Sequence, residues 1–192
     1  MIAKSAFEGC NLTEIEIPEG VTDIGDEAFY LCYELRSIKI PDSVKAIGYA
    51  AFQDCEHLQS IVIPDGVREI EDYTFCNCAN LQSIEIPQTV TVIGVHAFSG
   101  CGSLQSIEIP DELIVIEDDV FEDCDLQSVT IKTLEKDPNL SYKNIQFILQ
   151  ALSEISKPLE INLRVPIGCG YAYRRYSRFA GKLTKIIADV SD

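Results

Sequence analysis

The sequence predicts an α/β repeat fold: a solenoid of stacked units with a parallel β-sheet, followed by a C-terminal part that contains a helix. Three observations predict it. Phenylalanine recurs after 22 residues once and then after 23 residues four times, from Phe7 to Phe121. Most periods contain an alternating Ile-x-Ile segment followed by proline. After Ile131 this pattern gives way to apolar residues at helical spacing.

The repeat is defined by positions that recur in register. The period-locked phenylalanines are Phe7, Phe29, Phe52, Phe75, Phe98 and Phe121. The period-locked cysteines, three residues after each phenylalanine, are Cys10, Cys32, Cys55, Cys78, Cys101 and Cys124. A fixed period in the twenties is typical of solenoids, in which each unit packs only on its neighbours.

Each unit is expected to form one short strand. Leu-x-x-Ile-x-Ile alternates at its end, so both isoleucines lie on one face. The proline after the second isoleucine lacks a backbone donor and ends the strand. The segment Pro64-Asp65-Gly66 has the composition of a turn. One unit cannot bury its apolar face alone, so we expect the strands to stack about 4.8 Å apart in a parallel sheet.

This unit resembles the bacterial BspA-like leucine-rich repeat, Leu-x-x-Ile-x-Ile-Pro followed by Val-x-x-Ile-Gly-x-x-Ala-Phe-x-x-Cys. The resemblance covers residues 2–131 nearly position for position. It implies a leucine-rich-repeat solenoid with the parallel β-sheet on its concave face. It also implies a bacterial cell-surface or secreted protein that binds other macromolecules, as adhesion proteins do.

The chain is expected to form one domain with two parts. Residues 1–131 form the solenoid of about six 23-residue units. Residues 132–192 add a helix, a last strand and a cap. Ser141 is placed to cap this helix. Its apolar stripe at helical spacing consists of Ile145, Ile148, Leu149, Leu152 and Ile155.

The last strand and the cap follow this helix. Leu159–Val165 alternates before Pro166, which predicts a seventh strand. Val165 follows Ile131 by 34 residues, so we expect an insertion of about 11 residues before it. The stretch from Val165 to Ile186 resembles the end segment of BspA-like arrays, which implies the helical C-terminal cap.

The charge is unevenly distributed. The net charge is −16, but residues 1–131 hold 5 basic and 25 acidic side chains, whereas residues 132–192 hold 10 basic and 6 acidic ones. An acidic chain is a poor partner for nucleic acid, so none is expected. The absence of a long apolar run predicts no membrane span. The acidic surface either serves solubility alone or steers basic partners.

The chain begins inside a unit, because Ile2–Phe7 matches Ile47–Phe52. This predicts either a piece of a longer protein or an open edge near Leu12–Ile17. A partner or a second copy would cover that edge, so self-association is one expectation. The first residues contain no apolar signal-peptide segment.

The candidate binding residues flank the first isoleucine of each strand and point away from the core. They form two columns along the concave face: Glu14, Glu16, Ser37, Lys39, Ser60, Val62, Ser83, Glu85, Ser106, Glu108, Ser128 and Thr130. Five serines share one column. This column could bind a host or bacterial protein or a glycan. Alternatively, a small residue there only suits the close strand spacing of a curved sheet.

Residues that could support catalysis or bind metal are sparse. The period-locked cysteines lie among apolar positions, so we expect packed thiols; disulfides depend on a geometry that sequence cannot show. These cysteines recur once per unit and are therefore spread along the axis of the solenoid. A zinc ion needs four ligands that converge on one point, so no metal site is expected. His57 and His96 occupy different repeat positions, and no nucleophile, phosphate-loop or zinc-protease motif occurs. We therefore expect no catalytic residue and no cofactor.

The sequence thus favours a non-enzymatic module for protein–protein or protein–glycan binding. Two alternatives remain. The repeats could be a structural spacer within a larger protein, or the chain could be an intracellular scaffold.

Overall fold

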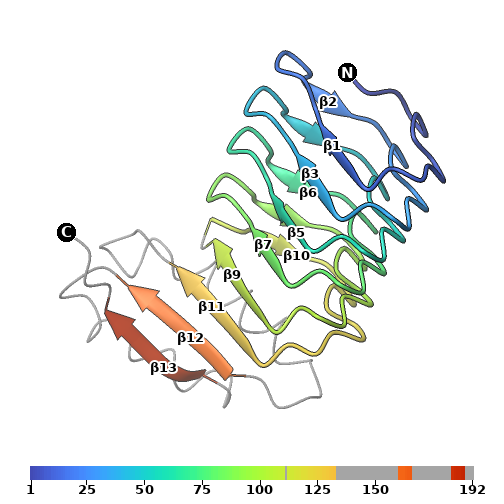
Figure 1. The fold of residues 1–192 in the computed structure, drawn as a ribbon. Helices are drawn as coiled ribbons and strands as arrows, with labels where there is room; N and C mark the ends of the chain where they lie inside the picture. Colours follow the sequence, from blue (N-terminus) through green and yellow to red (C-terminus); the bar gives the residue numbers. More distant parts are fainter. Residues whose placement is uncertain (111, 133–159, 166–182, 189–192) are drawn as a thin grey trace.

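The computed structural model describes residues 1–110, 112–132, 160–165 and 183–188. These residues form a solenoid of stacked coils, with the N-terminus at one end and β13 at the other (Figure 1). All strand pairs among the described residues are parallel. The predicted parallel solenoid is therefore confirmed.

One side of the solenoid carries the longer strands. They are β1 (Glu14–Glu16), β3 (Ser37–Lys39), β5 (Ser60–Val62), β7 (Ser83–Glu85), β9 (Ser106–Pro110), β11 (Ser128–Lys132), β12 (Glu160–Val165) and β13 (Leu183–Ala188). They pair in the orders β1-β3-β5-β7 and β9-β11-β12-β13, and β7 contacts β9.

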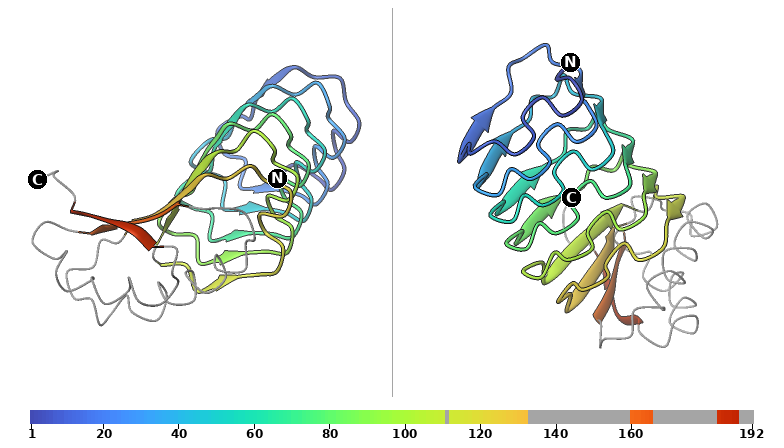
Figure 2. Two further views of the ribbon diagram at one scale, coloured as in Figure 1. Left: turned by 90° about the horizontal axis from the view of Figure 1, so that it is seen from below. Right: turned by 90° about the vertical axis from the view of Figure 1, so that its right-hand side faces the viewer.

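The other side carries a second set of two-residue strands, which the sequence analysis did not predict (Figure 2). They are β2 (Asp23–Ile24), β4 (Ala46–Ile47), β6 (Glu69–Ile70), β8 (Val92–Ile93) and β10 (Val115–Ile116). Each comes from the Val-x-x-Ile part of the repeat. Their isoleucines line the same core from the opposite side; Ile24, Ile47, Ile70 and Ile93 are buried.

A column of stacked phenylalanine rings runs along the core. Ring centroids of neighbouring phenylalanines from Phe7 to Phe121 lie 5.1 to 5.8 Å apart. The rings are nearly parallel, with interplanar angles of 1° to 9°. Phe29, Phe52, Phe75 and Phe98 are fully buried. The 23-residue period therefore places one ring above the next, and apolar burial holds successive coils together.

The backbone around each phenylalanine turns through two left-handed residues, at the second position before and after the ring. In the coil of Phe75 these are Tyr73 and Asn77, with φ angles of 59° each. The same two positions have positive φ in all six coils. A left-handed residue with a Cβ costs about 1–2 kcal/mol. Hydrogen bonds between coils offset this cost, as where the Phe75 amide donates to the Ala97 carbonyl over 2.9 Å.

The strand expected at Leu159–Val165 is confirmed as β12, but its register differs from the expectation. Leu163, not Val165, pairs with Ile131, so the offset is 32 residues rather than 34. The expectation aligned Pro166 with the prolines that end earlier strands. The strand β11 continues through Lys132, which stands where earlier units have proline. Proline therefore does not mark the register in this part of the chain, and that alignment was wrong.

The C-terminal part contains a further strand that the sequence analysis missed. Leu183–Ala188 was assigned to the cap, but it forms β13, which pairs with β12. The described residues contain no helix. The helix expected from Ser141 to Ile155 and the helical part of the cap lie outside the described residues.

Candidate functional site

The candidate binding residues lie together on the outward side of β1, β3, β5, β7, β9 and β11, here called the sheet face. The strand register aligns them into columns: Glu14 with Ser37, Ser37 with Ser60, Ser60 with Ser83, and Ser106 with Ser128. The second column aligns Glu16 with Lys39, Val62 with Glu85, and Glu108 with Thr130. Ten of the twelve are exposed; Ser128 and Thr130 are half-buried.

A third polar column lies beside the serines, and the sequence analysis missed it. Its exposed members are Gln59, Gln82, Gln105 and Gln127, each directly before a serine. Backbone hydrogen bonds hold the column in register, as where the Gln82 amide donates to the Gln59 carbonyl over 2.9 Å. The repeated Gln-Ser pair was the available signal. Amides and hydroxyls each donate and accept hydrogen bonds, so this part of the sheet face can bind neutral polar groups.

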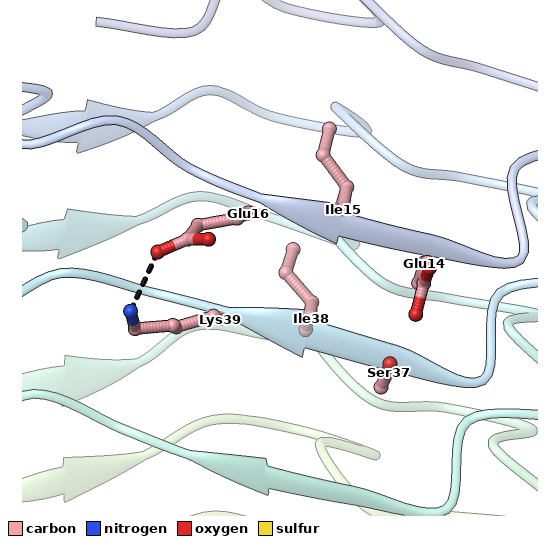
Figure 3. Close-up of a pocket in the computed structure, with 6 residues that line it drawn as sticks. All are labelled: Glu14, Ile15, Glu16, Ser37, Ile38 and Lys39. Atoms are coloured by element: carbon pink, nitrogen blue, oxygen red, sulfur yellow. Dashed lines mark hydrogen bonds and ion pairs between the residues drawn. The ribbon is translucent and has the colours of Figure 1, made fainter.

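The N-terminal part of the sheet face contains a shallow depression of about 410 Å³. Glu14, Glu16, Ser37, Lys39 and the two isoleucines between them line it (Figure 3). The Lys39 ammonium donates to Glu16 Oε1 over 2.5 Å. This bond raises the pKa of Lys39. Both side chains are well exposed, so the pair contributes little to stability and is available to a ligand.

The remainder of the sheet face combines neutral and acidic groups. Val62 is 57% exposed, an apolar contact beside the serine column. Glu85 and Glu108 are exposed on the neighbouring strands. The sheet face can therefore offer hydrogen bonds, one apolar contact and carboxylates to a ligand that lies across the strands.

The period-locked cysteines form a ladder of thiols, buried from Cys32 on, rather than a chemical site. From Cys32 on, each ladder thiol donates to the carbonyl of the phenylalanine one coil earlier, at 2.9 to 3.2 Å. Burial is the main cause that raises the pKa of Cys32 to about 12, and it also raises that of Cys55. Within the described residues the cysteines are free, and no three metal-binding side chains converge.

The two histidines also act separately. His57 Nδ1 lies 2.7 Å from the Tyr33 carbonyl oxygen. His96 Nδ1 lies 3.3 Å from Glu122 Oε2. They belong to different coils and different repeat positions, so they do not form a common site.

A family model describes this repeat. The model of the BspA-type leucine-rich repeat region, with six copies, matches residues 1–127 and 68–156. The chain belongs to the BspA-type leucine-rich repeat family. The resemblance inferred from the unit pattern is therefore confirmed.

Solved bacterial proteins share this fold. The chain is 26% identical to a leucine-rich repeat protein of T. pallidum, covering 96% of this chain and 72% of that one, with a TM-score of 0.62. It is 29% identical to a leucine-rich repeat protein of Bacteroides ovatus, covering 97% of this chain and 45% of that one, with a TM-score of 0.64. The pneumococcal vaccine antigen PcpA is 17% identical, with 94% and 42% covered and a TM-score of 0.67.

The chain thus spans less than half the length of two of these three structures. The search of curated proteins gives no match. Among the described residues, no helix has the length and apolar character needed to cross a membrane.

Proposed function

We propose that this chain is a non-enzymatic binding module of a bacterial surface or secreted protein, and that its sheet face binds a protein or a glycan. The observation that carries the proposal is the alignment of mostly polar and mostly exposed side chains in columns across consecutive strands. A solenoid continues such columns from coil to coil, so a ligand can make the same contact several times.

The chemistry of the columns supports an extended ligand. The serine and glutamine side chains can bond to the hydroxyls of a glycan or to the backbone of a polypeptide. Glu85 and Glu108 occupy the same position in their strands, and both add negative charge there. Each contact is weak by itself, so affinity would come from their repetition along the face.

The family supports the proposed location, because BspA-like repeats are expected at the cell surface or in secreted proteins. The expected concave curvature of the sheet face would let it surround part of a partner. A spacer role is the second possibility: the solved relatives from Bacteroides ovatus and pneumococcus are more than twice as long as the shared region.

The proposal is tested by charge reversal on the sheet face. The wild-type chain is first screened on a glycan array and a panel of purified extracellular proteins. Each ligand found is then measured by biolayer interferometry with Glu85→Lys combined with Glu108→Lys. Reversal of both charges should weaken binding about tenfold.

The matched control is Glu69→Lys combined with Glu112→Lys, which changes the charge equally at exposed positions off the sheet face. The control should bind within about twofold of wild type. Equal affinity of all three proteins would contradict a role for the sheet face. No ligand in either screen would favour the spacer.

A further inference from the structure

A second surface, away from the sheet face, combines aromatic rings with carboxylates. Tyr49, Tyr73 and His96 follow the neighbouring strands β4, β6 and β8 by two or three residues. The Tyr49 and Tyr73 ring centroids lie 5.8 Å apart, edge to face. The Tyr73 and His96 rings lie 5.1 Å apart. The three rings thus form one strip across three coils, here called the aromatic strip.

Carboxylates alternate with the aromatic residues along the solenoid. Asp26, Tyr49 and Asp72 occupy one repeat position, 23 residues apart, so they lie in consecutive coils. Backbone hydrogen bonds confirm this stacking, since the Glu27 amide donates to the Tyr49 carbonyl and the Ala50 amide to the Asp72 carbonyl. Tyr49 is 43% exposed, so its ring is accessible between the two aspartates.

The second column has the same character. Tyr73 and His96 are followed one coil later by Asp119, which occupies the same repeat position. Glu122, 52% exposed, pairs with His96. The aromatic strip is therefore bordered by carboxylates at both ends as well as along its length.

The backbone fixes the orientation of one of these carboxylates. Asp72 Oδ1 accepts the Val95 amide over 2.7 Å, which fixes its orientation beside the strip. Partial burial raises the pKa of Glu71, and the nearby charges of Glu69, Asp72 and Asp26 raise it further. Like charges that interact in this way repel each other, and a bound cation relieves that repulsion.

Few of the cationic side chains in the described part of the chain neutralise this surface. Among the described residues, the Lys4 ammonium pairs with Glu27 on this side, and His96 forms an ion pair with Glu122 only when its ring is protonated. The repeat region as a whole carries 25 acidic and 5 basic side chains. An approaching partner with positive charge is therefore attracted, and the aromatic strip is where a planar cation finds both a ring and a carboxylate.

We propose that the aromatic strip, with Asp26, Asp72 and Glu122, binds an arginine-rich segment of a partner protein. A guanidinium stacks on a tyrosine ring and forms paired hydrogen bonds with a carboxylate, which an ammonium cannot do in the same way. Each coil presents another ring or carboxylate, so successive arginines of an extended segment find successive partners. The surface is separate from the sheet face, and both can be occupied together.

The probe is a fluorescein-labelled peptide of alternating arginine and serine, about a dozen residues long, measured by fluorescence anisotropy at an ionic strength of about 0.15 M. A lysine–serine peptide of equal length has the same charge. Wild-type protein should bind the arginine peptide at least about threefold more tightly than the lysine peptide. Equal affinity for both peptides would overturn the proposal, because bulk charge alone would then explain binding.

Ring variants separate recognition from packing. Tyr49→Phe combined with Tyr73→Phe keeps both rings and should retain affinity for the arginine peptide within about twofold. Tyr49→Leu combined with Tyr73→Leu keeps apolar bulk and should lose about fivefold or more. Unchanged affinity of the leucine variant would refute the role of the rings.

Charge variants provide an independent test if the leucine variant does not fold. Asp26→Asn combined with Asp72→Asn keeps an oxygen for the Val95 amide and should weaken the arginine peptide about fivefold. Asp65→Asn combined with Glu112→Gln changes the net charge equally at exposed positions elsewhere and should stay within about twofold. Equal losses in the two pairs would place binding in the general acidic field and overturn the proposal.

Discussion

Removal of one ring from the centre of the phenylalanine column tests whether stacked burial holds the solenoid together. Phe75 is fully buried, and its ring lies 5.5 Å from the rings of both Phe52 and Phe98. Phe75→Ala removes this apolar surface and leaves a cavity, which costs about 3–5 kcal/mol. For a chain of this length the expected fall in Tm is about 10 °C.

The matched control is the same substitution at the first ring. Phe7 is half-buried and stacks on Phe29 at 5.1 Å. Phe7→Ala loses less buried surface, so it should cost about 1.5–2.5 kcal/mol. Urea unfolding followed by circular dichroism measures both free energies. Equal losses at the two sites, or a loss below about 1 kcal/mol at Phe75, would refute the reasoning that the central stack dominates stability.

Two further predictions follow from the thiol ladder and the left-handed backbone. Burial raises the folded-state pKa of Cys32 to about 12, and it also raises the pKa of Cys55 and Cys78 above the unfolded value of about 8.5. The folded chain therefore holds more protons, and stability should fall as the pH rises from about 9 to 12; iodoacetamide should label the buried thiols at pH 8 only after unfolding in urea. A flat stability between those pH values, or rapid labelling of the native chain, would contradict the buried ladder. Ala50 is buried with a φ of 51°, whereas its buried neighbour Ala51 has no positive φ. Ala50→Gly should therefore be about 1–2 kcal/mol more stable than Ala51→Gly in urea unfolding, and equal stabilities would show that the left-handed turn carries no strain.

The sequence alone was sufficient to predict the repeat architecture. The pattern of a single unit would be ambiguous, but each position here is repeated. The six period-locked phenylalanines therefore had to occupy equivalent places in successive coils. The alternation of Ile61 and Ile63 with exposed residues likewise predicted which side chains of β5 point outward. The residue pattern of the unit, rather than its period, indicated the family, which the family model confirms.

The tertiary structure decided whatever depends on contacts between coils. The strands β2, β4, β6, β8 and β10 have two residues each, which is too short to show alternation. Only their pairing with neighbouring strands reveals them. The register of β12 depends on where β11 ends. The alignment of Pro166 with the prolines of earlier units could not predict that position. The aromatic strip joins Tyr49 to Tyr73, which occupy adjacent repeat positions and meet only because the coils stack. The local pattern determines the conformation of each coil. The contacts across coils arise only once the chain has closed its turns, and these contacts create the sheet face and the aromatic strip.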